Sequence, residues 1–100
     1  MGNLFSLIVT CTFSDDKLRD FFHEKLCSKG GEQLNESTYS LPYRAEHVRE
    51  TCAALAKALT AFMQENKIKK EESDFVDLYC SAHLCDIPNS KDKILRWKIL

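Results

Sequence analysis

The segment from Gly31 to Tyr43, GEQLNESTYSLPY, constrains the fold of this chain more than any other part of the sequence. It separates two stretches with helical spacing, and it is long for a plain connection between two helices in a compact domain. Some regular structure is therefore expected within it. A polar, turn-prone cluster at Asn35, Glu36 and Ser37 lies near its middle, so we predict that the segment folds back as a β-hairpin near Asn35.

The second half of this hairpin contains the better strand sequence. Tyr39 and Leu41 alternate with polar residues and supply its apolar face, and Pro42 is expected to end the strand and lead toward the second helix. A single extended strand over residues 31–43 is the alternative, and it would leave a three-stranded α/β core of uncertain order. The hairpin therefore decides the topology.

Leu4–Phe13, LFSLIVTCTF, is predicted to form a central strand. Its alternation, together with its β-branched and aromatic content, is typical of a strand with one fully buried face. Ser14 follows as the expected N-cap of a helix over residues 15–29, in which apolar side chains recur at helical spacing. Gly30 suits the left-handed position that ends this helix.

The second predicted helix runs from Ala45 to about Asn66. Its apolar stripe repeats at alternating spacings of four and three residues and consists of Val48, Cys52, Leu55, Leu59 and Phe62. Charged and polar side chains occupy the opposite side. The helix should therefore lie on a sheet with one face exposed to water.

Two further strands are predicted in the C-terminal part of the chain. Phe75–Leu84, FVDLYCSAHL, alternates again, with Asp77 and Tyr79 on the face opposite to Leu78. Ile94–Leu100, ILRWKIL, closes the sequence as a short strand. Its two faces are formed by Leu95, Trp97 and Ile99 and by Ile94, Arg96, Lys98 and Leu100.

The predicted order is strand, helix, strand, strand, helix, strand, with one further short strand at the end. This is the α+β, ferredoxin-like βαββαβ arrangement, an antiparallel sheet with two helices on one face and an extra C-terminal strand. A chain of 100 residues with 44% hydrophobic and 29% charged residues has ordinary globular composition, so we expect a single domain over residues 1–100.

Charge and cysteine usage narrow the class of protein. The 14 basic and 15 acidic residues nearly cancel, so contact with RNA or DNA has to come from a local patch. Leu4–Phe13 is too short to span a membrane and no basic residue precedes it, so we expect no membrane partner, no signal peptide and a cytoplasmic protein. The five cysteines are then expected to be reduced thiols.

The hairpin sequence EQLNESTYSLP, set in this order of elements, resembles the CRISPR-associated protein 2 superfamily, and within it the GhoS-type antitoxins, small proteins that cleave a toxin's messenger RNA. The resemblance implies a symmetric homodimer of ferredoxin-like protomers. The terminal strand would pack on the partner's sheet through Ile94, Leu95, Trp97 and Ile99. A short strand with two hydrophobic faces needs an edge to pair with, and pairing within its own sheet is the alternative.

In nuclease members of this superfamily an aspartate at the end of the first strand binds a divalent metal across the dimer axis. In this chain Thr12 and Phe13 occupy that place, and Asp15 and Asp16 are the nearest carboxylates. These two aspartates are therefore the candidate catalytic residues, able to hold Mg²⁺ with water completing its shell. An Asp-Asp pair after Ser14 is also typical of a helix N-terminus.

The basic terminal strand is the candidate nucleic-acid-binding element. Arg96 and Lys98 are placed to contact phosphates, with Trp97 as a stacking ring on the reverse face. The acidic neighbours Asp86 and Asp92 dilute this positive field, and a solvated surface is the alternative.

Two groups of cysteine and histidine residues are candidates for a chemical site. Cys80, His83 and Cys85 are of zinc-ligand type, but alternation along a strand directs Cys80 away from the other two, and we predict no metal site. His23 and Cys27 lie four residues apart on one side of the first helix, as a Cys-His nucleophile pair requires. The sequence shows no third group to orient them, so ordinary helix packing is the interpretation that we favour.

Two functions follow from these observations. The first is a small dimeric, nucleic-acid-associated protein of the type that the resemblance implies, either a metal-dependent endoribonuclease or a binder of RNA or DNA without catalytic activity. The second is a non-catalytic protein-interaction module, an inhibitor or regulatory subunit, that holds a protein partner through its sheet edge. This architecture hosts many functions and does not choose between the two.

Overall fold

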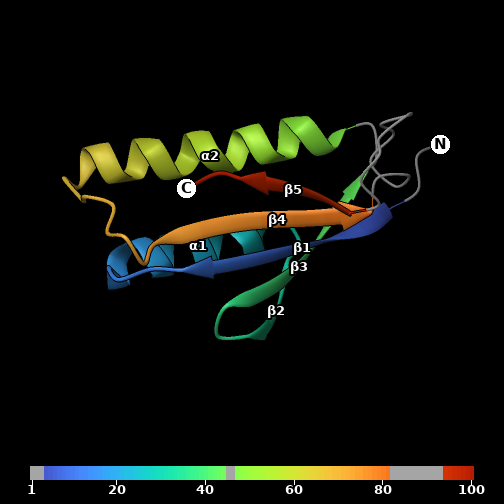
Figure 1. The fold of residues 1–100 in the computed structure, drawn as a ribbon, viewed down its shortest axis with the longest axis horizontal. Coiled ribbons are helices and arrows are strands. Elements are labelled where there is room, and N and C mark those ends of the chain that lie inside the picture. The colour runs from blue at the N-terminus through green and yellow to red at the C-terminus, as the bar shows by residue number, and fades with distance from the viewer. Residues whose placement is uncertain (1–3, 45–46, 82–93) are drawn as a thin grey trace.

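The alternating and helix-periodic segments form the strands and helices that their patterns predict (Figure 1). The structure, a computed structural model, describes residues 4–44, 47–81 and 94–100, so Ala45 and residues 82–84 of the predicted elements lie outside it. The elements in chain order are β1 (Leu4–Thr12), α1 (Asp16–Ser28), β2 (Glu32–Asn35), β3 (Thr38–Arg44), α2 (Val48–Glu65), β4 (Phe75–Ser81) and β5 (Ile94–Lys98).

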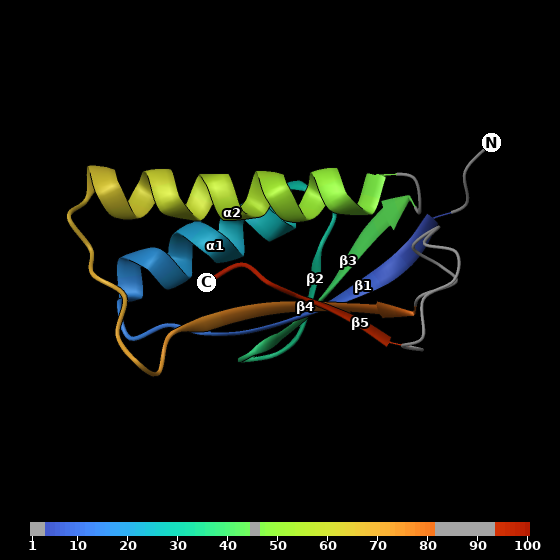
Figure 2. The ribbon, with the colours of Figure 1, turned by 45° about the horizontal axis from the view of Figure 1, so that its top comes forward.

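The strands form one antiparallel sheet in the order β2-β3-β1-β4-β5, and both helices cover the same face of it (Figure 2). β1 is central, since it pairs with β3 on one side and with β4 on the other. The first four strands have the ferredoxin-like order, and β5 extends the sheet beyond β4. The predicted α+β class, with its extra C-terminal strand, is confirmed.

The predicted hairpin forms, with its reversal where the polar cluster placed it. Asn35 pairs with Thr38 across the two residues Glu36 and Ser37. The Asn35 side chain holds this turn, because its Oδ1 accepts a hydrogen bond of 2.9 Å from the Ser37 amide. Before the turn the register shifts between Gln33 and Asn35, which marks a bulge in β2.

Pro42 does not end β3, and this prediction was wrong. The strand continues through Pro42 to Arg44, and Pro42 pairs with Ser6 of β1. The pairing with β2 reaches only as far as Ser40, so beyond that residue β3 is an edge strand on its β2 side. A proline in such a place removes no hydrogen bond from the sheet.

Asp15, and not Ser14 as predicted, is the N-cap of α1. The Asp15 carboxylate accepts a hydrogen bond of 3.0 Å from the Leu18 amide. The helix ends just before Gly30, which has the predicted left-handed conformation, with the positive φ of 86° that glycine adopts without strain. The amide of Gly31 donates to the Leu26 carbonyl at 2.8 Å, which closes the last turn of the helix.

The core lies between the sheet and the two helices. The stripe predicted for α2 is buried at Val48, Cys52, Leu55 and Leu59, with Phe62 half-buried. The two helices meet through Phe21 and Phe62, whose rings stack with centroids 4.1 Å apart. The buried apolar side chains of the other elements are Leu7, Val9, Cys11, Phe13, Leu18, Phe22, Leu26, Tyr39, Leu41, Tyr43, Val76, Leu78 and Cys80.

Ser14 has a different role from the predicted one, because it binds the buried carboxylate of Asp74. The Ser14 amide and hydroxyl donate to Asp74 at 2.7 and 3.2 Å, and the Glu71 amide donates at 2.9 Å. Burial alone would raise the pKa of Asp74, but these hydrogen bonds, together with the charge of Lys70, lower that pKa below its ordinary value. Asp74 thereby ties the end of β1 to the segment before β4.

β5 pairs with β4 of its own chain, which is the intramolecular alternative for the terminal strand. Trp97 is opposite Leu78, a core residue, and its half-buried ring packs against the core. Ile99 packs there as well, and its amide donates to the Val76 carbonyl at 3.0 Å. Trp97 and Ile99 therefore cover the protein's own interior.

The cysteines do not all match the prediction of reduced thiols. Cys11, Cys27 and Cys52 are free, but Cys80 is disulfide-bonded. Spacing and the expected cellular compartment informed the prediction, and neither of them reports which sulfur atoms the fold brings together.

Neither described helix has the length and hydrophobicity that crossing a bilayer requires.

Candidate nucleic-acid interface

One face of the sheet is covered by no described helix, and we call it the open face. The strand register arranges its side chains in rows that cross the sheet, and two of these rows run from β3 to β5. The first row contains Glu32, Ser40, Ile8, Tyr79 and Arg96. The second row contains Thr38, Thr10, Asp77 and Lys98. Polar, aromatic and basic side chains thus share one surface that crosses several strands.

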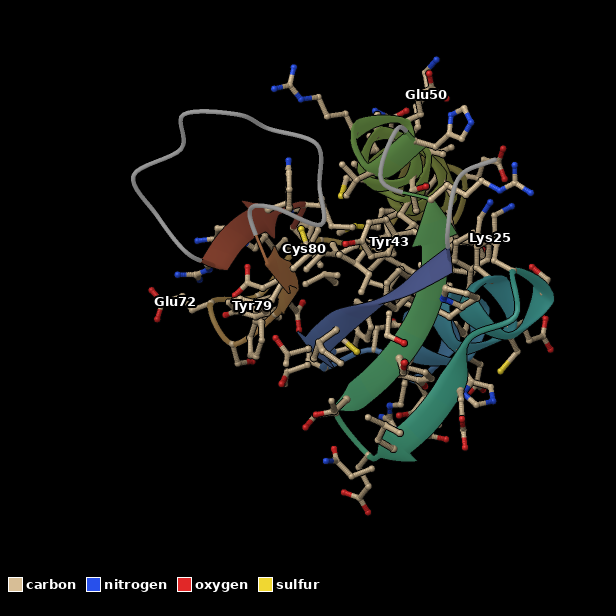
Figure 3. The ribbon with its side chains drawn as sticks, turned by 90° about the vertical axis from the view of Figure 1, so that its right-hand side faces the viewer. Lys25, Tyr43, Glu50, Glu72, Tyr79 and Cys80 are labelled. Carbon is tan, nitrogen blue, oxygen red and sulfur yellow. The ribbon has the colours of Figure 1, made fainter. Side chains whose placement is uncertain are left out.

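Tyr79 is the aromatic residue nearest the basic edge of this face. It is half-buried and lies between Ile8 of β1 and Arg96 of β5. Figure 3 shows Tyr79 on the side of β4 away from the helices, whereas Tyr43 and Cys80 lie on the side toward them. A phenol ring that rests on a strand and is open on one side is a surface on which a planar base can stack.

Phe75 places a second aromatic ring on the same strand and the same face. It is half-buried and pairs with the exposed Thr12 of β1. Phe75 and Tyr79 are four residues apart, so they are about 13 Å apart along an extended strand. Asp77 lies between them, and the open face therefore has two aromatic positions separated by one carboxylate.

Arg96 is held in place by Asp77. Its guanidinium donates a hydrogen bond of 2.7 Å to Asp77 Oδ2, and its side chain is 55% exposed while that of Asp77 is only 5% exposed. This hydrogen bond and the charge of Asp77 raise the pKa of Arg96. The guanidinium therefore stays charged, and more than half of the Arg96 side chain is exposed beside Tyr79.

Asp77 is a polar residue in a buried position. Among the described residues its Oδ1 has no hydrogen-bond partner, although the atom is shielded from solvent. An unsatisfied buried polar atom of this kind costs about 1–3 kcal/mol. Core packing does not explain an aspartate at this position. The contact that the structure shows for its carboxylate is the hydrogen bond from Arg96.

The three residues predicted to bind nucleic acid are divided between the two faces of the sheet. Arg96 and Lys98 are on the open face and exposed, with Lys98 opposite Asp77. Trp97 is on the helix-covered face, where its ring packs on the core. The aromatic side chain beside the two basic residues on this face is therefore that of Tyr79.

The residues predicted to form a dimer interface lie along β5 and just after it. The register pairs Ile94 with Ser81 and Leu95 with Cys80, while Trp97 and Ile99 pack on the protein's own core. Among the described strands, β5 has a neighbour on one side only. The backbone edge of β5 on the other side is thus open to a second chain among the described strands.

Asp15 and Asp16, the predicted catalytic pair, are both engaged locally. Asp15 caps α1, and Asp16 pairs with Arg19 on the same helix. Within residues 4–44, 47–81 and 94–100, no group of three or more His, Cys, Asp or Glu side chains is arranged to hold a metal ion. The structure thus places both carboxylates at a helix N-terminus.

Two members of the Cys80, His83 and Cys85 group, namely His83 and Cys85, lie outside the described residues. The third member, Cys80, is disulfide-bonded, so its thiolate is not available as a zinc ligand in this state.

Comparison of the chain with known protein families, with curated proteins and with solved structures finds no match in any of the three.

Two residues of interest were missed by sequence reasoning. The alternation of β4 already placed Tyr79 on one face with Asp77, but only strand order could show that Arg96 and Lys98 share this face. Tyr39 was predicted to supply the apolar face of its strand, and its ring is indeed buried. Its hydroxyl also contacts His23, which is sixteen residues earlier in the sequence. Neither relationship has a local signal in the sequence.

Proposed function

We propose that this protein is a small nucleic-acid-associated protein that binds single-stranded RNA on the open face. The observation that carries the proposal is the adjacency of Tyr79 to Arg96, with Lys98 in the next row of the same face. Four-stranded sheets of this topology bind RNA elsewhere through aromatic rings on the uncovered face, with basic side chains beside them. DNA shares the phosphates and the bases, and the sugar 2′-hydroxyl distinguishes RNA from it.

The chemistry of the face suits a single strand better than a duplex. Tyr79 and Phe75 offer ring faces, which only unpaired bases can reach. Arg96 and Lys98 supply two positive charges at the edge of the sheet, while Thr10 and Ser40 supply hydroxyl groups nearer its centre. The Asp77 carboxylate fixes one of these charges, and Glu32 in the row of Arg96 adds a second negative charge, so the two rows carry no net charge. Recognition by stacking is therefore favoured over recognition by charge alone.

Binding without cleavage is the form of this function that the geometry supports best. Asp15 caps α1 through Oδ1 and Asp16 pairs with Arg19, so each carboxylate already has a local partner on the helix. An RNA-cleavage assay with and without Mg²⁺, repeated with Asp15→Ala and Asp16→Ala, tests this point. Cleavage that disappears in both variants would establish the endoribonuclease form.

The binding experiment is a fluorescence anisotropy titration of a labelled oligouridine at about 50 mM salt, where phosphate contacts are strong. Tyr79→Ala should raise the Kd about 5- to 150-fold, since stacking contributes about 1–3 kcal/mol per base. Tyr79→Phe, which keeps the ring, should bind like the wild type. Equal Kd values for the wild type and Tyr79→Ala would contradict the proposal.

We also propose that the protein is a homodimer, formed by edge-to-edge pairing of β5. This strand is the sheet's last strand among the described residues, and strand edges are commonly satisfied by a second copy. Sedimentation equilibrium should then give twice the chain mass of 11.5 kDa. A monomer at concentrations well above those used for RNA binding would contradict the dimer without affecting the RNA proposal.

The second candidate function, a protein-interaction module, is favoured by one observation at the opposite edge of the sheet. Leu34 of β2 is 54% exposed and sits at the bulge of a strand whose four residues are all exposed. An exposed edge strand with an apolar side chain can pair with an extended peptide. Leu34→Lys and Tyr79→Ala separate the two functions. RNA binding that is lost with Tyr79→Ala and retained in Leu34→Lys supports the first, and inertness toward RNA supports the second.

A further inference from the structure

Three side chains from α1 and β3 form a continuous hydrogen-bonded array away from the open face. His23 Nδ1 lies 2.7 Å from the Tyr39 hydroxyl, and His23 Nε2 lies 3.6 Å from Cys27 Sγ. Both ring nitrogens of His23 are thus engaged, one by a phenol and the other by a thiol. This is the arrangement of nucleophile, base and orienting group that activates cysteine in enzymes.

The fold fixes this array from two directions. His23 and Cys27 are one helical turn apart on α1, so their side chains lie on the same side of the helix. Tyr39 is only 3% exposed, and its backbone pairs with Val9 of β1 and Gln33 of β2. The tyrosine ring is therefore held rigidly by the sheet, and its hydroxyl sets the orientation of the imidazole.

The Cys27 thiol differs from the other free thiols of the described residues. Cys11 and Cys52 are buried, and burial raises the pKa of each to about 11. Cys27 is exposed and has an imidazole nitrogen within hydrogen-bonding distance of its sulfur. Accessible cysteines with an adjacent base are the ones that react, whereas buried cysteines without one are inert.

We propose that Cys27 is an activated nucleophilic thiol, with His23 as its base and Tyr39 as the residue that positions His23, and that it reacts with small-molecule disulfides. His23 Nε2 accepts the thiol proton while Nδ1–H donates to the Tyr39 oxygen. The Cys27 sulfur then attacks one sulfur of the disulfide, a new S–S bond forms and the old one breaks. The departing thiolate takes the proton back from His23, so the products are a mixed disulfide at Cys27 and one free small thiol.

The test is the rate of mixed-disulfide formation with oxidised glutathione, followed by intact mass and assigned to a cysteine by peptide mapping. We expect the adduct at Cys27, none at Cys11 or Cys52 in the native protein, and none in Cys27→Ser. His23→Gln should lower the rate about tenfold or more, because the proton acceptor is lost. Adduct formation at Cys27 at an unchanged rate in His23→Gln would overturn the proposal.

A double-mutant comparison separates positioning from a general structural effect. Tyr39→Phe keeps the buried ring and removes only the hydroxyl, so we expect a rate between those of the wild type and His23→Gln. If Tyr39 acts through His23, the same substitution made in the His23→Gln background changes nothing further. An equal loss of rate in both backgrounds would overturn the positioning role. Continued protection of Cys11 and Cys52 in each variant confirms that the fold is intact.

Discussion

Arg96 donates to Asp77 at 2.7 Å although the register places Arg96 opposite Tyr79 and Lys98 opposite Asp77. The contact is therefore diagonal across β4 and β5, at a spacing that long side chains can cross. Within the described residues Lys98 has no ion-pair partner. The two basic side chains of β5 thus differ in role, since one neutralises a buried carboxylate and the other faces solvent.

Arg96→Ala should therefore destabilise the fold more than Lys98→Ala does. Removal of Arg96 leaves the Asp77 carboxylate buried without its donor, whereas removal of Lys98 takes away a solvated side chain. Thermal unfolding should show a lower Tm for Arg96→Ala, and Asp77→Asn added to that variant should recover part of the loss. Indistinguishable Tm values for the two alanine variants would show that the diagonal Arg96–Asp77 contact does not stabilise the fold.

The salt dependence of RNA binding should separate phosphate contacts from stacking. For a single strand, the slope of log K against log salt changes by about 0.7 for each phosphate contact that is lost. Lys98→Ala should reduce the slope by about this amount, while Tyr79→Ala should weaken binding with little change of slope. Lys57→Ala is the matched control, because Lys57 is exposed on α2, far from the open face. An equal effect of Lys57→Ala would show that binding is not confined to the open face.

The elements of this fold could be predicted because each carries a periodic pattern and a local end signal. The reversal at Asn35 was predictable from three polar residues, and the end of α1 from Gly30. Pro42 and Ser14 were misassigned for one reason, because the role of each depends on a distant segment. Pro42 is tolerated where β2 has ended, and Ser14 binds Asp74, which lies sixty positions later.

The candidate sites could be predicted only in part, because they depend on which strands become neighbours. Alternation correctly put Arg96 and Lys98 on one face and Trp97 on the other. It could not show that the ring beside them would be Tyr79, since that requires β5 to pair with β4 in one particular register. A single sequence carries no signal for such a register.

The free thiols of the core should report on unfolding. At pH 8 Cys11 and Cys52, with a pKa of about 11 each, are almost entirely protonated as well as buried. Iodoacetamide should therefore alkylate them only when the protein opens, at a rate that rises with urea in step with the loss of helical circular dichroism. Rapid alkylation without denaturant would mean that the core opens locally, at β1 if Cys11 reacts or at α2 if Cys52 reacts.

Gly30→Ala should destabilise the protein by about 1–2 kcal/mol, the cost of a left-handed conformation for a residue with a Cβ atom. The φ of Gly30 is 86°, and an added Cβ would lie 3.2 Å from Pro42 Cγ. Gly30→Asn should cost less, since asparagine adopts this conformation more readily. Urea unfolding of both variants measures the difference, and equal stability of Gly30→Ala and the wild type would contradict the assigned helix end.

The Asp74 carboxylate should make the fold sensitive to acid. Its pKa is lowered in the folded state from the ordinary 3.8, so its contribution to stability is fully present above that value and is lost as the pH falls through the folded-state pKa.

Asp74→Asn removes the charge that the Ser14 and Glu71 amides stabilise, and hydrogen bonds to a charged group contribute about 1.5–3 kcal/mol. The variant should therefore be less stable than the wild type at pH 7 by about that amount, and the difference should narrow below pH 3.8 as the wild-type carboxylate is protonated. Urea unfolding measured from pH 7 downward follows both curves. A constant difference across this range would mean that Asp74 stabilises the junction through its shape and not through its charge.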